Sequence, residues 1–294
     1  MRIQLQELLE KRVQQCVTNS RSPIDLCEKI ERKREALSNR KAGMIKVKAK
    51  GKIDHIEPSE GELEKVLYQV HLQYLIQQKD HLYLEEEIEL RKAEFYKGIL
   101  VDDQEINPFF SEDDRVIDPP KLDLEEQDER VAFHYNRLKA VQYAERWWND
   151  YNPAYKKFDV DCTNYISQCL HAGEAPMRGH PNRSKGWWMQ NNNWSYSWTV
   201  ANSLRWYLPG STIGLRAKAV TSPDELLLGD VICYDFQGDG RFDHSTIVTG
   251  RDTFGMPLVN AHTTNSRMRY WAYEDSTAYT PNIQYKFFTI IDDE

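Results

Sequence analysis

A cysteine stands in a polar cluster just where an apolar helix is expected to begin. In the stretch FDVDCTNYISQC apolar residues recur at helical spacing, which predicts a helix over residues 161–172. Cys162 then lies in the first turn, where the helix dipole and the unpaired N–H groups favour a thiolate and could stabilise an oxyanion. Cys169, two turns later, lacks this environment and is predicted to be packing. The chemistry indicated is nucleophilic attack by sulfur.

Asp161 directly precedes this cysteine. Aspartate is a favoured helix N-cap, and its charge suits the start of a helix. A carboxylate beside the thiol would raise the pKa of the thiol, however, so we expect the Asp161 side chain to point elsewhere.

A nucleophilic thiol needs a base, and His244 is the candidate. Residues 230–262 read as three strands, the second of which begins at His244 after a Gly/Asp-rich connection. A histidine at the mouth of a sheet can face a helix N-terminus and take the proton from a thiol. His262 and Asn260 lie two positions apart on the third strand and share one face, so either could fix the tautomer of His244.

Aromatic side chains gather shortly after the cysteine helix. The segment GWWMQNNNWSYSW, residues 186–198, holds four tryptophans and three asparagines. Burial in the core is one interpretation, and a cleft wall that stacks on sugars or peptides is the other. The residues proposed to contact substrate are Trp187, Trp188, Trp194 and Tyr155. Tyr151 and Tyr155 are further candidates as oxyanion donors, against the alternative of ordinary buried tyrosines.

No metal or organic cofactor is expected. The run DFQGDGRFD resembles the first half of a calcium loop, but position 12 is Thr246 instead of a bidentate glutamate. A tight connection between strands is the better interpretation. His55, His71 and His81 lie at strand-like positions without partner ligands.

The elements around these residues predict an α+β protein in three parts. Residues 1–101 read as a small α+β domain, with helices over 2–17 and 22–37 followed by antiparallel strands over 44–101. Ser22 suits the N-cap of the second helix and Pro23 its first position. An acidic, proline-containing linker covers 102–129. The remaining residues, 130–294, form the domain that carries the chemistry and begin with a helix over 133–149.

Composition excludes several classes of function. The net charge is +7 over residues 1–50, −14 over 51–130 and −1 over 131–294, so nucleic acid is not an expected partner; solvated helix faces are the simplest reading of the acidic middle. No stretch approaches the roughly 18 apolar residues of a membrane helix, and the first residues lack the apolar core of an export signal. Five sparse cysteines indicate a reducing compartment. A cytoplasmic location is predicted, with action at the cell envelope or during spore formation as alternatives.

The ordered motifs DCTNYISQCL, LLLGDVICYDFQGDGRFDHSTIVTG and PLVNAHTT together resemble the bacterial putative amidase domain family over about residues 133–290. That family is similar to the NlpC-type and CHAP-type enzymes of the papain-like superfamily. The resemblance implies a papain-like fold, in which a helix bundle packs on an antiparallel sheet. It matches Cys162 to the nucleophile, His244 to the base, and His262, or alternatively Asn260, to the third residue.

The activity implied by the resemblance is hydrolysis of amide bonds through an acyl-thioenzyme, often in peptidoglycan peptides. Two alternatives stay open at this point: a non-catalytic module that binds cell-wall glycans or peptides, and an acyl or peptidyl transferase that uses the same thiol. Residues 1–125 have no counterpart in the resemblance. A protein partner that binds through the N-terminal domain is compatible with each reading.

Overall fold

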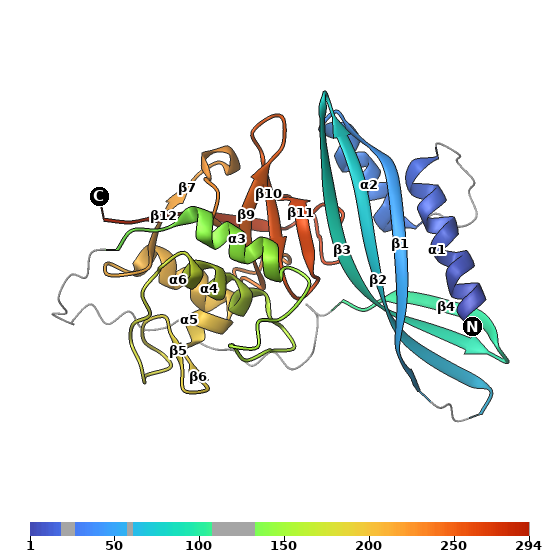
Figure 1. Cartoon of the computed structure of the whole chain (residues 1–294), viewed down its shortest axis with the longest axis horizontal. Coiled ribbons are helices and arrows are strands. Elements are labelled where there is room, and N and C mark those ends of the chain that lie inside the picture. The colour runs from blue at the N-terminus through green and yellow to red at the C-terminus, as the bar shows by residue number, and fades with distance from the viewer. Residues whose placement is uncertain (19–26, 58–60, 108–132, 294) are drawn as a thin grey trace. The chain divides into compact units, whose positions relative to one another are not determined.

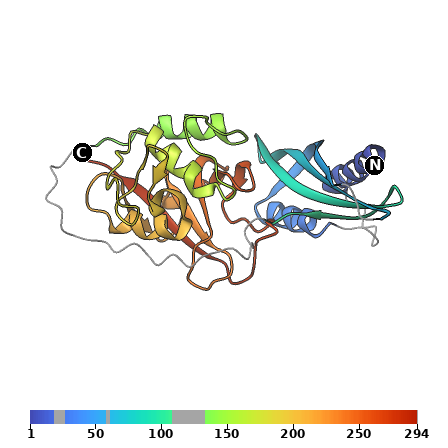
Figure 2. The ribbon, with the colours of Figure 1, turned by 90° about the horizontal axis from the view of Figure 1, so that it is seen from below.

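Two compact units make up the chain. The computed structural model describes residues 1–18, 27–57, 61–107 and 133–293 (Figures 1 and 2). The first unit comprises Met1–Pro108 together with Thr264–Tyr279, and the second comprises Phe109–Thr263 and Thr280–Glu294. The N-terminal domain expected from the sequence is therefore completed by a late segment of the chain.

The first unit consists of two helices on one face of an antiparallel sheet (Figure 1). Its elements are α1 (Arg2–Val17), α2 (Glu28–Asn39), β1 (Ala42–Glu57), β2 (Leu63–Gln78), β3 (His81–Tyr96), β4 (Ile99–Glu105) and β11 (Ser266–Tyr270). The strand order is β1-β2-β3, and both β4 and β11 pair with β3. The predicted first helix and strands are confirmed. The second helix begins later than predicted, because Cys27 holds the N-cap position; Ser22 and Pro23 lie outside the described residues.

Buried charges fill the space between α2 and β3. Alternation along β3 turns Glu85, Glu87 and Glu89 to the same face, and all three are buried. Lys29 of α2 lies 2.6 Å from Glu89 and 3.2 Å from Glu87, while Lys33 forms an ion pair with Glu85. The expectation that the acidic residues form solvated faces is therefore wrong for this strand, because lysines of α2 compensate them.

The segment Thr264–Tyr279 contributes to the same network. Arg269, on β11, donates to Asp275 at 2.9 Å, and the other oxygen of Asp275 accepts from Lys33 at 2.6 Å. Both residues of the segment are buried. The first unit is thus held to this late segment by paired charges in its interior.

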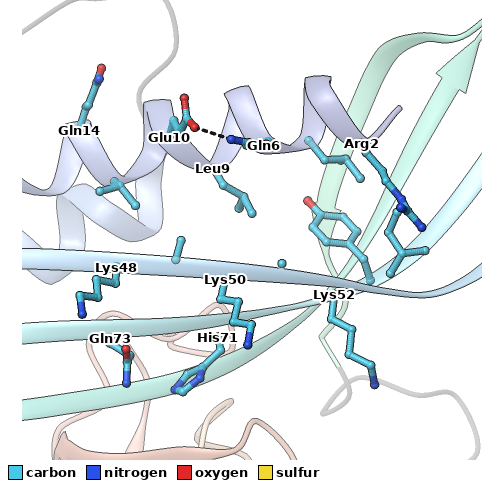
Figure 3. Close-up of a pocket in the computed structure, with 16 residues that line it drawn as sticks. Arg2, Gln6, Leu9, Glu10, Gln14, Lys48, Lys50, Lys52, His71 and Gln73 are labelled. Carbon is cyan, nitrogen blue, oxygen red and sulfur yellow. Dashed lines mark hydrogen bonds between the residues drawn. The ribbon is translucent and has the colours of Figure 1, made fainter.

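A pocket of about 1100 Å³ opens in the first unit between α1 and the strands β1 and β2 (Figure 3). Leu9 points from α1 toward β1, whereas Lys48, Lys50 and Lys52 point from the opposite side of that strand. None of its lining residues is among the candidate catalytic residues.

The second unit packs helices on an antiparallel sheet of strand order β10-β9-β8-β12-β7. Its helices are α3 (Arg137–Trp147), α4 (Cys162–Ala172), α5 (Tyr196–Thr199) and α6 (Ala201–Gly210). Its strands are β5 (Met189–Gln190), β6 (Asn193–Trp194), β7 (Arg216–Val220), β8 (Val231–Asp235), β9 (His244–Arg251), β10 (Pro257–Ala261) and β12 (Gln284–Ile291), with β5 and β6 forming a separate hairpin. The α+β class is confirmed, as is the helix predicted from Cys162.

The second unit encloses α4 on nearly every side. Residues Cys162 to Leu170 are all buried, and Ile166 and Cys169 belong to one hydrophobic cluster with Cys233 of β8. Cys169 is fully buried and serves as packing, as predicted, and Cys233 is fully buried as well. Among the described residues, no helix has both the length and the apolar character needed to cross a membrane. The predicted linker overlaps β4 at its start, and from residue 108 to 132 the chain is outside the described part.

Candidate active site

Cys162 is the first residue of α4, and its side chain is only 2% exposed. The thiol donates to the carbonyl oxygen of Asp243 at 3.9 Å. Asp243 directly precedes His244, the first residue of β9, and the N–H of Ser245, which follows His244, also donates to the Cys162 sulfur. The start of α4 and the start of β9 therefore meet at the thiol.

The environment of Cys162 keeps the thiol protonated in this structure. Burial raises the pKa of the Cys162 thiol, and the hydroxyls of Thr163 and Thr263 and the N–H of Ser245 offset this only in part by hydrogen bonding to the sulfur. This direction runs against the prediction that the helix start favours the thiolate, because desolvation outweighs the hydrogen bonds to the sulfur. Burial also raises the pKa of Cys169 well above its ordinary value.

His244 is fully buried beside two aromatic rings. Its ring centroid lies 5.6 Å from that of Tyr234, its partner across the strand pair, and 6.0 Å from that of Phe236, on which it stacks. The connection before it is fixed by Asp243, whose carboxylate accepts from the N–H of Phe236 at 3.3 Å. Burial raises the pKa of Asp243 to about 6.

Asp161 occupies the N-cap position of α4 without capping the helix through its side chain. One carboxylate oxygen accepts from the N–H of Phe158 at 3.0 Å and from the amide of Asn164 at 2.9 Å. The other oxygen lies 2.8 Å from Nδ1 of His262. Both oxygens of the carboxylate are therefore engaged, by Phe158, Asn164 and His262.

His262 lies one residue beyond β10 and supports Asp161. Its Nε2 lies 2.7 Å from the carbonyl oxygen of Trp147, which can only accept, so this nitrogen carries a hydrogen. Its ring stacks on Tyr165 of α4, with centroids 4.0 Å apart. Because both ring nitrogens are engaged with Asp161 and Trp147, the predicted role of His262 as the orienter of His244 does not fit this structure.

Asn260 lies on β10 and joins three elements. Its side-chain oxygen accepts from the hydroxyl of Thr249 on β9 at 2.8 Å, and its amide donates to Glu145 of α3 at 2.8 Å. These contacts position α3 against the sheet. The role of Asn260 as an alternative orienter stays a prediction.

Thr263 is a residue at this site that the sequence argument missed. Its hydroxyl oxygen accepts from two backbone N–H groups, that of Asp161 at 3.1 Å and that of Cys162 at 3.0 Å. Two N–H groups at the start of α4 are therefore bound by a side chain from another part of the chain, in place of Asp161. The run NAHTT, which begins within the last residues of β10, is the signal in the sequence, and it does not single out this threonine.

The aromatic residues proposed to contact substrate divide into two groups. Trp187 and Trp188 are 0% and 1% exposed, and Trp187 donates to Ser167 of α4 at 2.9 Å. Core burial explains these two, and neither presents a ring face to a ligand here. Trp194 and Tyr155 are half-buried: Lys156 lies 4.4 Å from the Trp194 ring, and Tyr155 stacks on Trp198.

The Gly/Asp-rich connection before β9 is organised by hydrogen bonds. Asp235 accepts from the N–H groups of Gly238 at 2.7 Å and Gly240 at 2.8 Å. Its carboxylate is thereby occupied in holding the turn, which agrees with a tight connection. Within the described ranges, no group of three or more histidine, cysteine, aspartate or glutamate side chains is arranged to hold a metal ion.

The site lies within a region that identifies the family of the chain. Residues 134–288 match the family described as "Putative amidase domain", and the chain belongs to this family. The description indicates a hydrolase that acts on amide bonds.

Two curated relatives come from Bacillus subtilis (strain 168). The "Uncharacterized protein YhbB" is 56% identical over 268 residues, which cover 90% of this chain and 86% of the relative. The "Uncharacterized protein YjcM" is 33% identical over 140 residues, 45% of this chain and 31% of the relative. No solved structure matches the chain at a significant level.

Proposed function

We propose that the chain is a cysteine-dependent amidase of papain-like architecture, with Cys162 as nucleophile and His244 as general base. The observation that carries this proposal is the thiol at the start of α4, in contact with the carbonyl of Asp243, the residue directly before His244. The family, described as a putative amidase domain, supports the reaction class.

The proposed reaction proceeds in two steps. His244 takes the thiol proton of Cys162 as the sulfur attacks the amide carbon, and the developing oxyanion binds N–H groups at the start of α4. The protonated histidine then gives its proton to the leaving amine, and a thioester forms. In the second step His244 takes a proton from water, the hydroxide attacks the thioester, and the carboxylic acid and free thiol are released.

The substrate class we propose is peptide amides such as those of peptidoglycan. The resemblance to NlpC-type and CHAP-type enzymes supports this class. The half-buried side chains of Trp194 and Tyr155 are the aromatic faces proposed for substrate contact. Trp187 and Trp188 are left out, since their rings are enclosed by protein.

Digestion of purified muropeptides, followed by mass spectrometry of the products, tests the function. The wild-type chain is expected to release new amine and acid termini, and Cys162→Ala is expected to lower the rate at least about thousandfold. Cys169→Ala is the matched control, because that residue lies on the same helix and is fully buried. The folded fraction of the Cys169→Ala variant is expected to be as active as the wild type.

Three results would contradict the proposal. Binding of muropeptides with no turnover by the wild-type chain would favour a binding module. Products joined to an added amine, at the expense of free acid, would favour a transferase. Equal activity of the Cys162→Ala variant and the wild type would exclude sulfur as the nucleophile.

A further inference from the structure

The hydroxyl of Thr263 stands where an oxyanion is expected to bind. Two backbone N–H groups converge on this single oxygen, at 3.1 Å from Asp161 and 3.0 Å from Cys162. Oxyanion sites use the same geometry, with donors 2.7–3.1 Å from the charged oxygen. The hydroxyl also hydrogen-bonds to the Cys162 sulfur, so the oxygen is next to both the donors and the nucleophile.

The backbone of Thr263 is strained to hold this position. Its φ angle is +80°, in a region that β-branched residues rarely adopt and that costs about 1–3 kcal/mol. A glycine would take this conformation without cost. The threonine side chain persists there because its hydroxyl satisfies two N–H groups of α4 that would otherwise be unpaired.

Thr263 is also the last residue of the second unit before the chain enters the first. The segment Thr264–Tyr279 belongs to the first unit, where Asp275 is bound to Lys33. At the other end of the segment, Thr280 donates to the carbonyl of Phe236, whose ring stacks on His244. The two residues of the second unit that flank the segment thus lie close to the candidate catalytic pair: Thr263 contacts Cys162, and Thr280 binds Phe236, which contacts His244.

We propose that the Thr263 hydroxyl is an internal occupant of the oxyanion site, which a substrate carbonyl must displace before Cys162 can attack. This inference rests on the proposed function. Movement of the Thr263 backbone and side chain away from the two N–H groups would open the site. Release of the strained backbone favours that movement, and the lost hydrogen bonds oppose it until the substrate oxygen replaces the hydroxyl.

Binding of an aldehyde tests the inference on the full chain. N-acetylalaninal forms a reversible hemithioacetal with a catalytic thiol, and its oxygen requires the oxyanion site. Thr263→Gly removes the occupant and suits the φ angle of +80°, so it is expected to bind the aldehyde about tenfold more tightly than the wild type. Thr263→Ser, the matched control, keeps the hydroxyl and is expected to bind within about twofold of the wild type. Affinity is measured as protection of Cys162 from iodoacetamide, by mass spectrometry.

The outcomes separate this inference from the proposed function. In one outcome, the wild type forms an adduct whose affinity is equal to or higher than that of Thr263→Gly. That result would show that the hydroxyl only caps the helix, and it would overturn this inference while leaving the proposed function intact. Absence of an adduct in every variant would overturn both. If Thr263→Gly does not fold, Thr263→Ala is compared with Thr263→Ser, and equal affinities overturn the inference.

Discussion

Replacing His262 with phenylalanine is expected to destabilise the second unit by about 3–5 kcal/mol. Phenylalanine keeps a ring that can stack on Tyr165, whose centroid lies 4.0 Å from that of His262. It removes both ring nitrogens, so the substitution separates the polar contacts of His262 from its packing.

The magnitude follows from the burial of Asp161. This carboxylate is 1% exposed, and His262 is its partner at Oδ2. After the substitution, Oδ2 loses that donor while Oδ1 keeps the N–H of Phe158 and the amide of Asn164. Leaving a buried charge without its ionic partner costs about 3–5 kcal/mol. Adding Asp161→Asn removes the charge, so the double variant is expected to recover about 2–3 kcal/mol of that loss.

Unfolding in guanidinium chloride, followed by tryptophan fluorescence, measures these values. Seven of the eight tryptophans lie in the second unit, all except Trp271, so the signal reports mainly on that unit. His171→Phe is the control: His171 lies on α4, the helix that Asp161 precedes, and it hydrogen-bonds to the carbonyl of Ala175 at 3.1 Å. Its expected cost is about 1 kcal/mol. Equal costs for the two histidines, or additive effects of His262→Phe and Asp161→Asn, would refute the reasoning.

Three further predictions address pH and charge. The rate of Cys162 alkylation by iodoacetamide should keep rising above pH 9, because burial raises the pKa of this thiol above its ordinary value of 9.0. Burial raises the pKa of the Asp243 carboxyl group from 3.8 to about 6, so the stability that is present below pH 3.8 is lost as the pH rises through 6. Asp243→Asn should remove this loss. The variant is expected to be more stable than the wild type at pH 7 by about 1 kcal/mol, a value that allows for the partial exposure of the side chain. Lys33→Met should destabilise the first unit by about 3–5 kcal/mol, because Glu85 and Asp275 would stay buried without their lysine partner. The measurement is amide hydrogen exchange, which should become faster in β3.

Each of these predictions has its own control. A cysteine in a short peptide gives the reference for how the alkylation rate depends on pH. An alkylation rate at Cys162 that levels off below pH 9 would contradict the first prediction. Asp239→Asn changes a neighbouring carboxylate in the same connection between β8 and β9. If it changed the pH dependence of stability as much as Asp243→Asn does, the second prediction would be contradicted. Lys52→Met removes an exposed lysine of the same unit, with 76% of its side chain exposed; an equal effect on exchange would contradict the third.

The local elements of this protein could be predicted because their patterns are strong. Alternation and a high content of β-forming residues predicted antiparallel strands over residues 44–101, and helical spacing predicted a helix over 161–172 with Cys162 in its first turn. The position of His244 at the start of β9 followed from the turn residues before it. These features depend on neighbours along the chain, which a sequence displays directly.

Other features depend on contacts between distant residues, and the sequence conceals them. Glu85, Glu87 and Glu89 look like a solvated face until α2 supplies lysines against them. The segment with β11 pairs with β3 through only two residue pairs, and its polar composition suggests a surface loop. The raised pKa of Cys162 arises from burial, which spacing cannot reveal.

The path of the chain through Thr264–Tyr279 also sets the order in which the protein can be completed during synthesis. Glu85 and Glu87 leave the ribosome about 190 residues before Asp275 does, and translation at about 5–20 residues per second makes that interval roughly 10–40 s. Over that time the nascent N-terminal half lacks the arginine and the aspartate that complete its charged interior. Final closure of the first unit therefore waits for nearly the whole polypeptide, and a fragment ending at residue 108 would never reach it.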